Sequence, residues 1–355
     1  MTEREDASAS DIVGFAFTRK KVKYSVLDEV LPESMLDATV TFFIDMKYML
    51  DIMRIDYYKQ AVTNELIPNS NRVIAEFMNL VVHYRRYLVE KRNCKVTFLL
   101  MFDDGKVDPI KLEANAAYGT KKMEKTVKPT FLQFIGKKIQ RIAPCLPGMK
   151  VVDSGSNELT CIPYVLTDTL KSKYNIFLSD DPLLQMLSST LPNCFSLRPN
   201  GVHSKSVGKN GYFRHLYEKN KWVISDDSEM KIDDSYIRLF LNLTGWDDGC
   251  PIADIKNKKA VKIINKLKES DIKFINYDAL ADHPEFKGRD DLIEELRSRD
   301  VCYNPHIHAA MIKEADSLHI INQYSDSNRP SREEFSYYNR EYFGNVVDET
   351  TLFMV

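Results

Sequence analysis

The sequence predicts an α/β protein in which a central, mainly parallel sheet is flanked by helices and followed by a smaller helical appendage. Apolar, β-rich runs alternate with stretches of helical periodicity between residues 38 and 240. This alternation is typical of a parallel sheet covered on both faces. After about residue 240 the pattern changes to short helices behind the turn-rich segment TGWDDGCP, which indicates a separate helical region.

Four apolar runs account for the expected strands: TVTFFI before Asp45, KVTFLLMF at 95–102, MKVVD at 149–153 and NIFLS at 175–179. Helical spacing is expected over 72–90, in a long basic stretch that ends near 143, and over 157–173. We therefore divide the chain into an N-terminal extension (1–37), an α/β domain (38–240), a helical region (241–300) and a C-terminal segment (301–355). The aromatic residues of the last segment are expected to serve packing or the docking of a partner; they are Tyr337, Tyr338, Tyr342 and Phe343.

Composition excludes several classes of protein. With 44% hydrophobic and 28% charged residues the chain reads as an ordinary globular protein. No apolar run approaches the roughly 20 residues of a membrane span, and the opening MTEREDASAS lacks the apolar region of a secretory signal. The six cysteines form no CxxC pair. We therefore expect an intracellular protein that does not bind a membrane and has neither a disulfide framework nor a zinc ribbon.

Positive charge is concentrated in two segments of a chain whose net charge is −2. Residues 106–150 hold ten lysines or arginines against three acids, and residues 254–268 hold six lysines against one acid. Local basic segments in a neutral chain suit a polyanion that is gripped in places and handled by acids elsewhere. Solvated lysines on surface helices explain either segment equally well.

Acidic residues follow three of the expected strands directly: Asp45, the pair Asp103 and Asp104, and the pair Asp180 and Asp181. The carboxyl ends of parallel strands share one edge, where ligands bind. Carboxylates that converge there repel one another, and a divalent cation removes the penalty. Oxygen-only ligation favours Mg²⁺ or Mn²⁺. Glu158 and one of two acids in the later turn, Asp247 or Asp248, are positioned to join this edge.

The same residues also allow simpler interpretations. Asp is common after strands as a turn former or helix cap, so an unrelated α/β protein with coincidental acids is one alternative. A haloacid-dehalogenase-type phosphatase needs DxD where this chain has Asp45-Met46-Lys47. His306 and His308 form a metal pair or, more simply, lie on a surface or core strand. The segment GVHSKSVGKNG (201–211) lacks phosphate-loop spacing and is expected to be a loop.

Five motifs in order resemble the flap endonuclease and 5′-to-3′ exonuclease family, a branch of the PIN-like nucleases. They are FFID at 42–45, LMFDDG at 100–105 with AAYGTKK at 116–122, SNELTCIPYVL at 156–166, IFLSDDPLLQML at 176–187 and LTGWDDGCPIADIKNKKAVKIINKL at 243–267. The style is that of phage ribonuclease H and of the 5′-nuclease domain of bacterial DNA polymerase I. The resemblance covers about residues 40–270 and implies a PIN-like sheet, a basic arch over 106–143 and a helix-three-turn-helix that binds duplex DNA.

The resemblance also implies the chemistry. The protein would be a metal-dependent nuclease that hydrolyses phosphodiester bonds at 5′ ends or flaps of DNA or RNA–DNA hybrids in replication or repair. The catalytic residues would be Asp45, Asp103, Glu158, Asp180 and Asp247. One or two Mg²⁺ or Mn²⁺ ions would bind among these residues and Asp104, Asp181 and Asp248. Nucleic acid would contact Lys111, Lys121, Lys122, Lys125, Lys256, Lys258 and Lys259.

Several positions depart from the family pattern. Thr160 and Cys161 stand where the family has acidic ligands, and Pro182 replaces an acid of the SDxD motif. The glycines of the family's GIG hairpin, which let backbone amides approach phosphate, are replaced by Asp254-Ile255-Lys256. These losses favour an alternative function, in which a catalytically impaired nuclease fold binds nucleic acid or assembles with replication or transcription proteins.

Overall fold

The computed structural model describes residues 33–50, 74, 77–78, 81, 84–106, 108–114, 130–146, 148–166, 169–170, 172–179, 181, 183–184, 186–187, 193–197, 221–223, 231–245, 252, 255–270, 277–281, 283–284, 286–325, 333 and 336–337. Within these residues, no helix combines the length and apolarity needed to cross a membrane.

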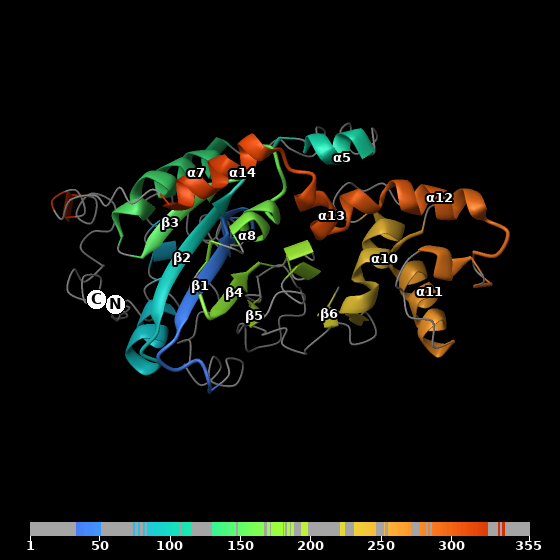
Figure 1. The fold of residues 1–355 in the computed structure, drawn as a ribbon, viewed down its shortest axis with the longest axis horizontal. Coiled ribbons are helices and arrows are strands. Elements are labelled where there is room, and N and C mark those ends of the chain that lie inside the picture. The colour runs from blue at the N-terminus through green and yellow to red at the C-terminus, as the bar shows by residue number, and fades with distance from the viewer. Residues whose placement is uncertain are drawn as a thin grey trace, which may run out of the picture.

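A five-stranded parallel sheet forms the centre of the protein (Figure 1). Its strands are β1 (Thr39–Asp45), β2 (Lys95–Phe102), β3 (Met149–Asp153), β4 (Tyr174–Leu178) and β5 (Cys194–Leu197), in the order β3-β2-β1-β4-β5. All four neighbouring pairs are parallel. The predicted α/β class with a parallel sheet is confirmed. The strand β5 and an antiparallel pair, β6 (Lys221–Val223) with β7 (Lys231–Asp233), were not predicted.

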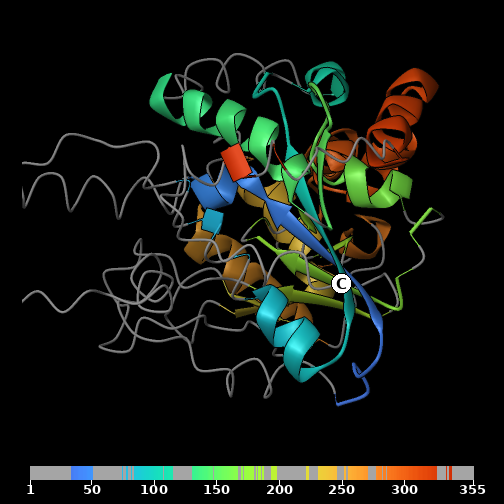
Figure 2. The same ribbon diagram turned by 90° about the vertical axis from the view of Figure 1, so that its left-hand side faces the viewer.

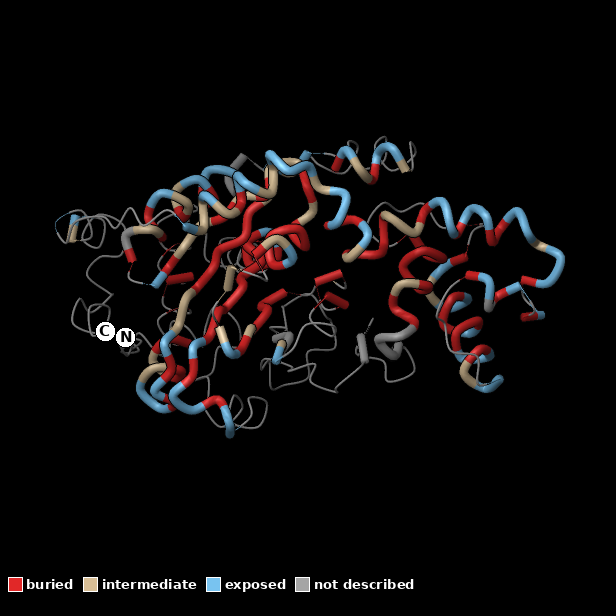
Figure 3. The backbone as a smooth tube through the Cα atoms, viewed as in Figure 1, coloured by how far each residue is buried: buried red, intermediate tan, exposed pale blue. Residues whose placement is uncertain are grey.

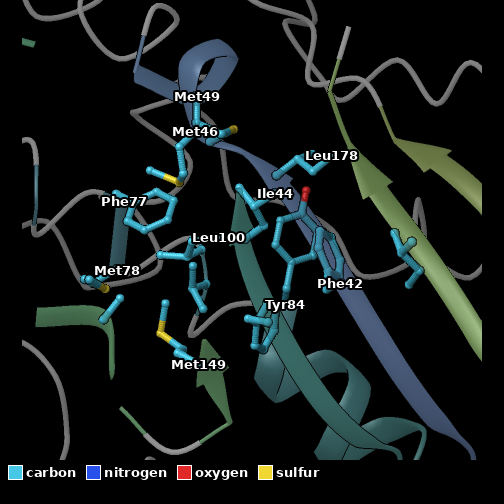
Figure 4. Packing of buried hydrophobic residues seen from close by; sticks show 14 of the residues in the cluster. Phe42, Ile44, Met46, Met49, Phe77, Met78, Tyr84, Leu100, Met149 and Leu178 are labelled. Carbon is cyan, nitrogen blue, oxygen red and sulfur yellow. The ribbon is translucent and has the colours of Figure 1, made fainter. Parts of the chain in front are cut away.

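Both faces of the sheet are covered, because the strands are apolar on both sides. In β1 every residue after Thr39 is buried (Figure 3). On one face, Phe42 and Leu100 pack against Phe77 and Tyr84 of the helical stretch that precedes β2 (Figure 4). On the other face, a second cluster contains Phe43, Leu99, Met101, Val152, Cys161, Ile162, Ala309 and Ile320. Burial of this apolar surface, at about 25 cal/mol per Å², is the main force that holds the layers together.

Helices form a layer on each side of the strands (Figure 2). The first layer contains a π-helix, η1 (Tyr87–Lys91), and α7 (Thr130–Ile142), which is followed by a 3₁₀ turn, η2 (Ala143–Cys145). The opposite layer contains α8 (Cys161–Leu166), α13 (Pro305–Ala310) and α14 (Glu314–Ser325). The helix predicted over 157–173 is therefore shorter than expected.

Only part of the predicted basic arch is described. The short helix α5 (Pro109–Ala114) follows β2, and α7 begins at Thr130. Residues 115–129, with Lys121, Lys122 and Lys125, lie outside the described residues. The arch over 106–143 stays a prediction.

A helical lobe has its own buried core. It comprises α10 (Asp234–Thr244), α11 (Asn257–Glu269), η5 (Tyr277–Leu280), α12 (Asp290–Ser298) and η6 (Asp300–Cys302). Its core includes Ile237, Phe240, Ile264, Leu267 and Leu296. In Figure 1 this lobe extends away from the sheet beyond α13. After η6 the chain returns to the sheet through α13 and α14.

The helix α14 covers the edge strand β3. The Gln323 side chain accepts a hydrogen bond from the backbone N–H of Asp153 (2.8 Å) and donates one to its carbonyl oxygen (3.0 Å). A side-chain amide thus takes the place of a neighbouring strand at this position. Such cover protects an edge strand from pairing with another chain.

Candidate functional site

Asp45 is a buried carboxylate at the end of β1. Its side chain is 4% exposed. The backbone N–H of Tyr48 donates to Oδ1 (3.0 Å), and the Ser179 hydroxyl donates to Oδ2 (2.6 Å). Burial raises the pKa of Asp45, the hydrogen bonds from Ser179 and Tyr48 oppose this effect, and the charge of Asp103 adds to it. The surroundings as a whole therefore disfavour the negative charge of Asp45.

Asp103 follows β2 directly, and its negative charge acts on two other acids at strand ends, Asp45 and Asp153. Its carboxylate raises the pKa of Asp45 on one side and that of Asp153 on the other, in each case after the larger effect of burial. The register pairs Asp45 with Met101, and Phe102 with Asp153. The ends of β1, β2 and β3 therefore lie at one edge of the sheet, as the sequence predicted for the first two.

Asp153 was not among the predicted site residues, although it ends the predicted strand MKVVD. Its Oδ1 accepts a hydrogen bond from the Gly155 N–H (2.8 Å), and burial together with Asp103 and Asp104 raises its pKa. The signal that identified Asp45 and Asp103, an acid at a strand end, was present here too.

Asp104 has a different role from its neighbour in the described structure. Its Oδ1 accepts a hydrogen bond from the Lys106 N–H (2.8 Å), and its Oδ2 forms an ion pair with the Lys106 ammonium (3.2 Å). These contacts stabilise the turn after β2. Of the two adjacent acids, Asp103 is the one whose charge acts on Asp45.

The residues after β4 divide into a described and an undescribed part. Ser179, which sequence reasoning missed, bonds Asp45 and also accepts the Asp181 N–H (3.0 Å). Asp181 Oδ1 accepts the Leu183 N–H (2.7 Å) and so caps the next helical turn. The remaining predicted ligands, Asp180, Asp247 and Asp248, lie outside the described residues. Ser179 stands in the quoted SDD run, so a hydroxyl beside the strand-end acids was its available signal.

Lys111 and Glu158 form a buried ion pair close to this edge. The ammonium of Lys111, on α5, lies 2.7 Å from Oε1 of Glu158, which precedes α8. Their side chains are 3% and 14% exposed. Lys111 was expected to contact nucleic acid and Glu158 to bind metal, and in the structure the two charges face each other. Each charge therefore has a partner within the protein, even without nucleic acid or a metal ion.

A second buried group joins α5 to α8 and α13. Asp108 and His308 are each 2% exposed, and the Nε2 atom of His308 lies 3.0 Å from Oδ2 of Asp108. The Nδ1 atom of His308 lies 3.6 Å from the thiol of Cys161. Burial raises the pKa of this thiol, so it keeps its proton. His308 therefore lies between a buried carboxylate and a neutral thiol.

The two histidines do not share one site. They lie on the helix α13, not on the strand that was expected. The His306 ring stands 6.3 Å from the Tyr164 ring, and burial lowers the pKa of His306. Residues two apart on a helix face different directions, and this separates His306 from His308.

Thr160 stands at a position where the resembled motif has an acid, and so adds no carboxylate to the site. Its side chain is buried, and among the described residues its hydroxyl has no hydrogen-bond partner. With the neutral Cys161 thiol beside it, this stretch supplies one carboxylate, Glu158, where the family pattern has more.

A metal site cannot be completed from the described residues alone, since no three of their His, Cys, Asp and Glu side chains form a group that could hold an ion. Among the described residues, Asp45 and Asp103 are the acids that could contribute ligands to such a site. They are oxygen donors, they repel each other, and burial disfavours the charge of Asp45. Such donors fit Mg²⁺ or Mn²⁺ and not a thiophilic metal.

The helix α11 presents a basic face away from the core of the lobe. Lys258, Lys259, Lys262 and Lys266 are exposed, and so is Lys256 just before the helix. Ala260, Ile263, Ile264 and Leu267 are buried on the other side. The amphipathic pattern thus gives an exposed row of ammonium groups, which can neutralise phosphates without reading sequence.

Comparison with known proteins finds similarity in solved structures alone. No family model matches the chain, and no curated protein matches it. The T5 5′-exonuclease with bound zinc is 12% identical, with 87% of this chain and 100% of that chain covered and a TM-score of 0.45. The bacteriophage T5 flap endonuclease with DNA and metal ions is 11% identical, with 86% and 99% covered and a TM-score of 0.43. The catalytic core of Rad2 with a DNA substrate is 11% identical, with 94% of each chain covered and a TM-score of 0.40.

These solved structures are nucleases of the kind that the motifs resemble. Because every one of these TM-scores is below 0.5, the interpretation of the site rests on the contacts within this chain.

Proposed function

We propose that the protein is a metal-dependent nuclease that hydrolyses phosphodiester bonds at 5′ ends or flaps of DNA or RNA–DNA hybrids in replication or repair. One observation carries the proposal. Asp45 is buried at a strand end, and its charge is disfavoured by burial and by Asp103 at the end of the next strand. This edge of an open parallel sheet is where ligands bind, and a divalent cation would relieve the repulsion.

The residues at the edge have distinct parts in this proposal. Asp45 and Asp103 would hold the ion, and Ser179 with the Tyr48 N–H fixes the direction of the Asp45 carboxylate. The ion, when bound, would polarise the scissile phosphate and lower the pKa of a water molecule. Lys111, which is buried and paired with Glu158, would add positive charge to this edge without contacting the phosphate. Asp180 and Asp247 are further proposed ligands.

Nucleic acid would be held by the basic face of α11. Its exposed lysines would contact the duplex backbone, with Lys256, Lys258 and Lys259 nearest the amino end of the helix. Such contacts give affinity that depends strongly on salt. In the arch, Lys121, Lys122 and Lys125 are proposed to guide a single-stranded end.

A second candidate function is a catalytically impaired nuclease fold that binds nucleic acid or assembles in a replication or transcription complex. The observation that favours it is the pair of Lys111 and Glu158. Because an ammonium lies 2.7 Å from this carboxylate, Glu158 has its counter-charge without a metal. Thr160 supplies no replacement carboxylate.

Cleavage assays separate the two functions. The substrates would be 5′-labelled flap, nicked and single-stranded DNA and an RNA–DNA hybrid, each with Mg²⁺, Mn²⁺ or a chelator. Asp45→Asn and Asp103→Asn should each lower the cleavage rate by at least about 100-fold. Asp290→Asn, at an exposed acid of α12, is the matched control and should change nothing. Metal-independent cutting, or cutting that survives both site variants, would refute the proposal. Binding without any cutting would favour the second candidate.

Binding is tested separately by its salt dependence. Replacing Lys258, Lys259 and Lys262 together by Gln should reduce the slope of log K against log salt by about 2–3, because each phosphate that a lysine neutralises contributes about 0.9 to that slope. Lys313→Gln, at an exposed lysine before α14, should leave the slope unchanged. An unchanged slope in the triple variant would exclude α11 as the duplex-binding face.

A further inference from the structure

Asp108 organises the backbone at the start of α5. Its Oδ1 accepts hydrogen bonds from the N–H groups of Ile110 (2.9 Å) and Lys111 (3.1 Å), so the Asp108 carboxylate caps the helix. Its Oδ2 accepts the N–H of Glu158 (2.8 Å). One buried carboxylate thus fixes the backbone on both sides of the ion pair that Lys111 forms with Glu158.

His308 completes the surroundings of this carboxylate from a distant part of the sequence. Its Nε2 lies 3.0 Å from Asp108 Oδ2, a close contact whose direction is not that of a hydrogen bond. Its other nitrogen faces Cys161, 147 residues away in the sequence. In this way α13 touches the start of both α5 and α8.

The helix α5 depends on such contacts for its position. It has six residues, and a helix this short is not stable by itself. Besides Asp108, it packs against η6, where the Cys302 thiol lies 3.9 Å from the Lys111 carbonyl oxygen. The helix α13 contacts both α8 and η6 and lies between the sheet and the helical lobe (Figure 1).

We propose that α13 is part of the candidate active site and that His308 is a positioning residue. Through Asp108 it holds the start of α5 and the segment before α8, and with them the Lys111–Glu158 pair, at the carboxyl edge of the sheet. The role of these two charges in catalysis rests on the proposed function. The positioning itself is a property of this chain's own contacts.

The experiment compares His308→Leu, which fills the space without a polar atom, with His308→Gln, which keeps a polar N–H group next to Asp108. His306→Leu is the matched control on the same helix. Asp108→Asn keeps the Oδ1 acceptor and places an amide where Oδ2 accepts the Glu158 N–H. Circular dichroism confirms that each variant is folded. Hydrogen–deuterium exchange is then followed in peptides covering 108–114 and 154–160, and kcat and KM are measured on a flap substrate.

Positioning predicts that His308→Leu and Asp108→Asn speed exchange in both peptides by at least about tenfold, and that His308→Gln restores most of the protection. His308→Leu and Asp108→Asn should also lower kcat by at least about tenfold, with KM within about twofold. His306→Leu should change neither the exchange rates nor kcat. Unchanged exchange in folded His308→Leu, or no recovery in His308→Gln, would overturn the inference. If His308→Leu does not fold, the exchange rates of the other two variants decide the matter. Protection in His308→Gln with faster exchange in Asp108→Asn supports the inference, and equal exchange in the two variants overturns it. If the unaltered protein cuts nothing, the proposed function fails while the exchange result still judges the positioning.

Discussion

The Lys111–Glu158 pair should be strongly coupled in folding. Removing the ammonium by Lys111→Met leaves a carboxylate that is 14% exposed facing an apolar side chain. Breaking a buried ion pair from one side costs about 3–5 kcal/mol, and the remaining solvent contact of Glu158 places the expected loss near 3 kcal/mol. Glu158→Gln leaves the buried ammonium of Lys111 without its charged partner, and we expect a similar loss.

The double variant gives the diagnostic value. With both charges gone, no unpaired charge remains, and a buried pair replaced by neutral groups of similar size is often tolerated. Lys111→Met with Glu158→Gln should therefore cost no more than either single change, about 3 kcal/mol and not about 6. The coupling free energy would be about 3 kcal/mol, at the upper end of measured side-chain couplings.

Urea denaturation at pH 7, followed by circular dichroism, measures each free energy of unfolding. The control cycle uses Arg297 and Glu294 on α12, an exposed pair with side chains 45% and 73% exposed. Its coupling should not exceed about 0.5 kcal/mol. Equal m-values across the variants are required, because two cores can unfold in separate steps. A coupling for Lys111 and Glu158 as small as that of the control would refute the reasoning.

Two further changes follow from the structure. Burial raises the pKa of Asp45 above 3.8, so near that pH the folded protein binds more protons at this group than the unfolded chain does. Asp45 therefore makes the folded state less stable as the pH rises from 3.8 through the folded pKa. In urea denaturation, the free energy of unfolding of Asp45→Asn relative to that of the unaltered protein should rise between pH 3.5 and 7. At Gly148 φ is +71° and an added Cβ would lie 2.8 Å from the Val96 carbonyl oxygen, so Gly148→Ala should cost about 1–3 kcal/mol. Gly155→Ala, at φ +64° with open space around the Cβ, should cost less in thermal denaturation, and the opposite order would contradict the steric argument.

The sheet and its acidic edge were predictable because the signals are local. Each of β1 to β4 is an apolar run bounded by polar residues, and parallel pairing brings their ends to one edge. Asp45 and Asp103 could therefore be placed before any contact was known. Asp153 carried the same signal, because it is an acid at the end of the apolar run MKVVD.

The contacts that join distant segments were not predictable from the same patterns. Lys111 lies in a basic stretch, which predicted an exposed phosphate-binding lysine. Its burial depends on Glu158, and no local periodicity indicates that pair. His308 was similarly ambiguous, since its partners Asp108 and Cys161 come from other elements and the helix α13 is too short to show an apolar stripe.

The two parts of the acidic edge differ in charge balance, and this difference bears on how many ions the site would hold. Glu158 has an ammonium at 2.7 Å, so a cation placed beside it would have to compete with Lys111. At Asp45, the positive charge of Lys47 lowers the pKa, yet burial and Asp103 leave it raised on balance. A divalent cation would therefore gain most at Asp45 and Asp103. If the proposed function holds, one ion would therefore bind near the ends of β1 and β2, and the part near α8 would keep its charges balanced without an ion.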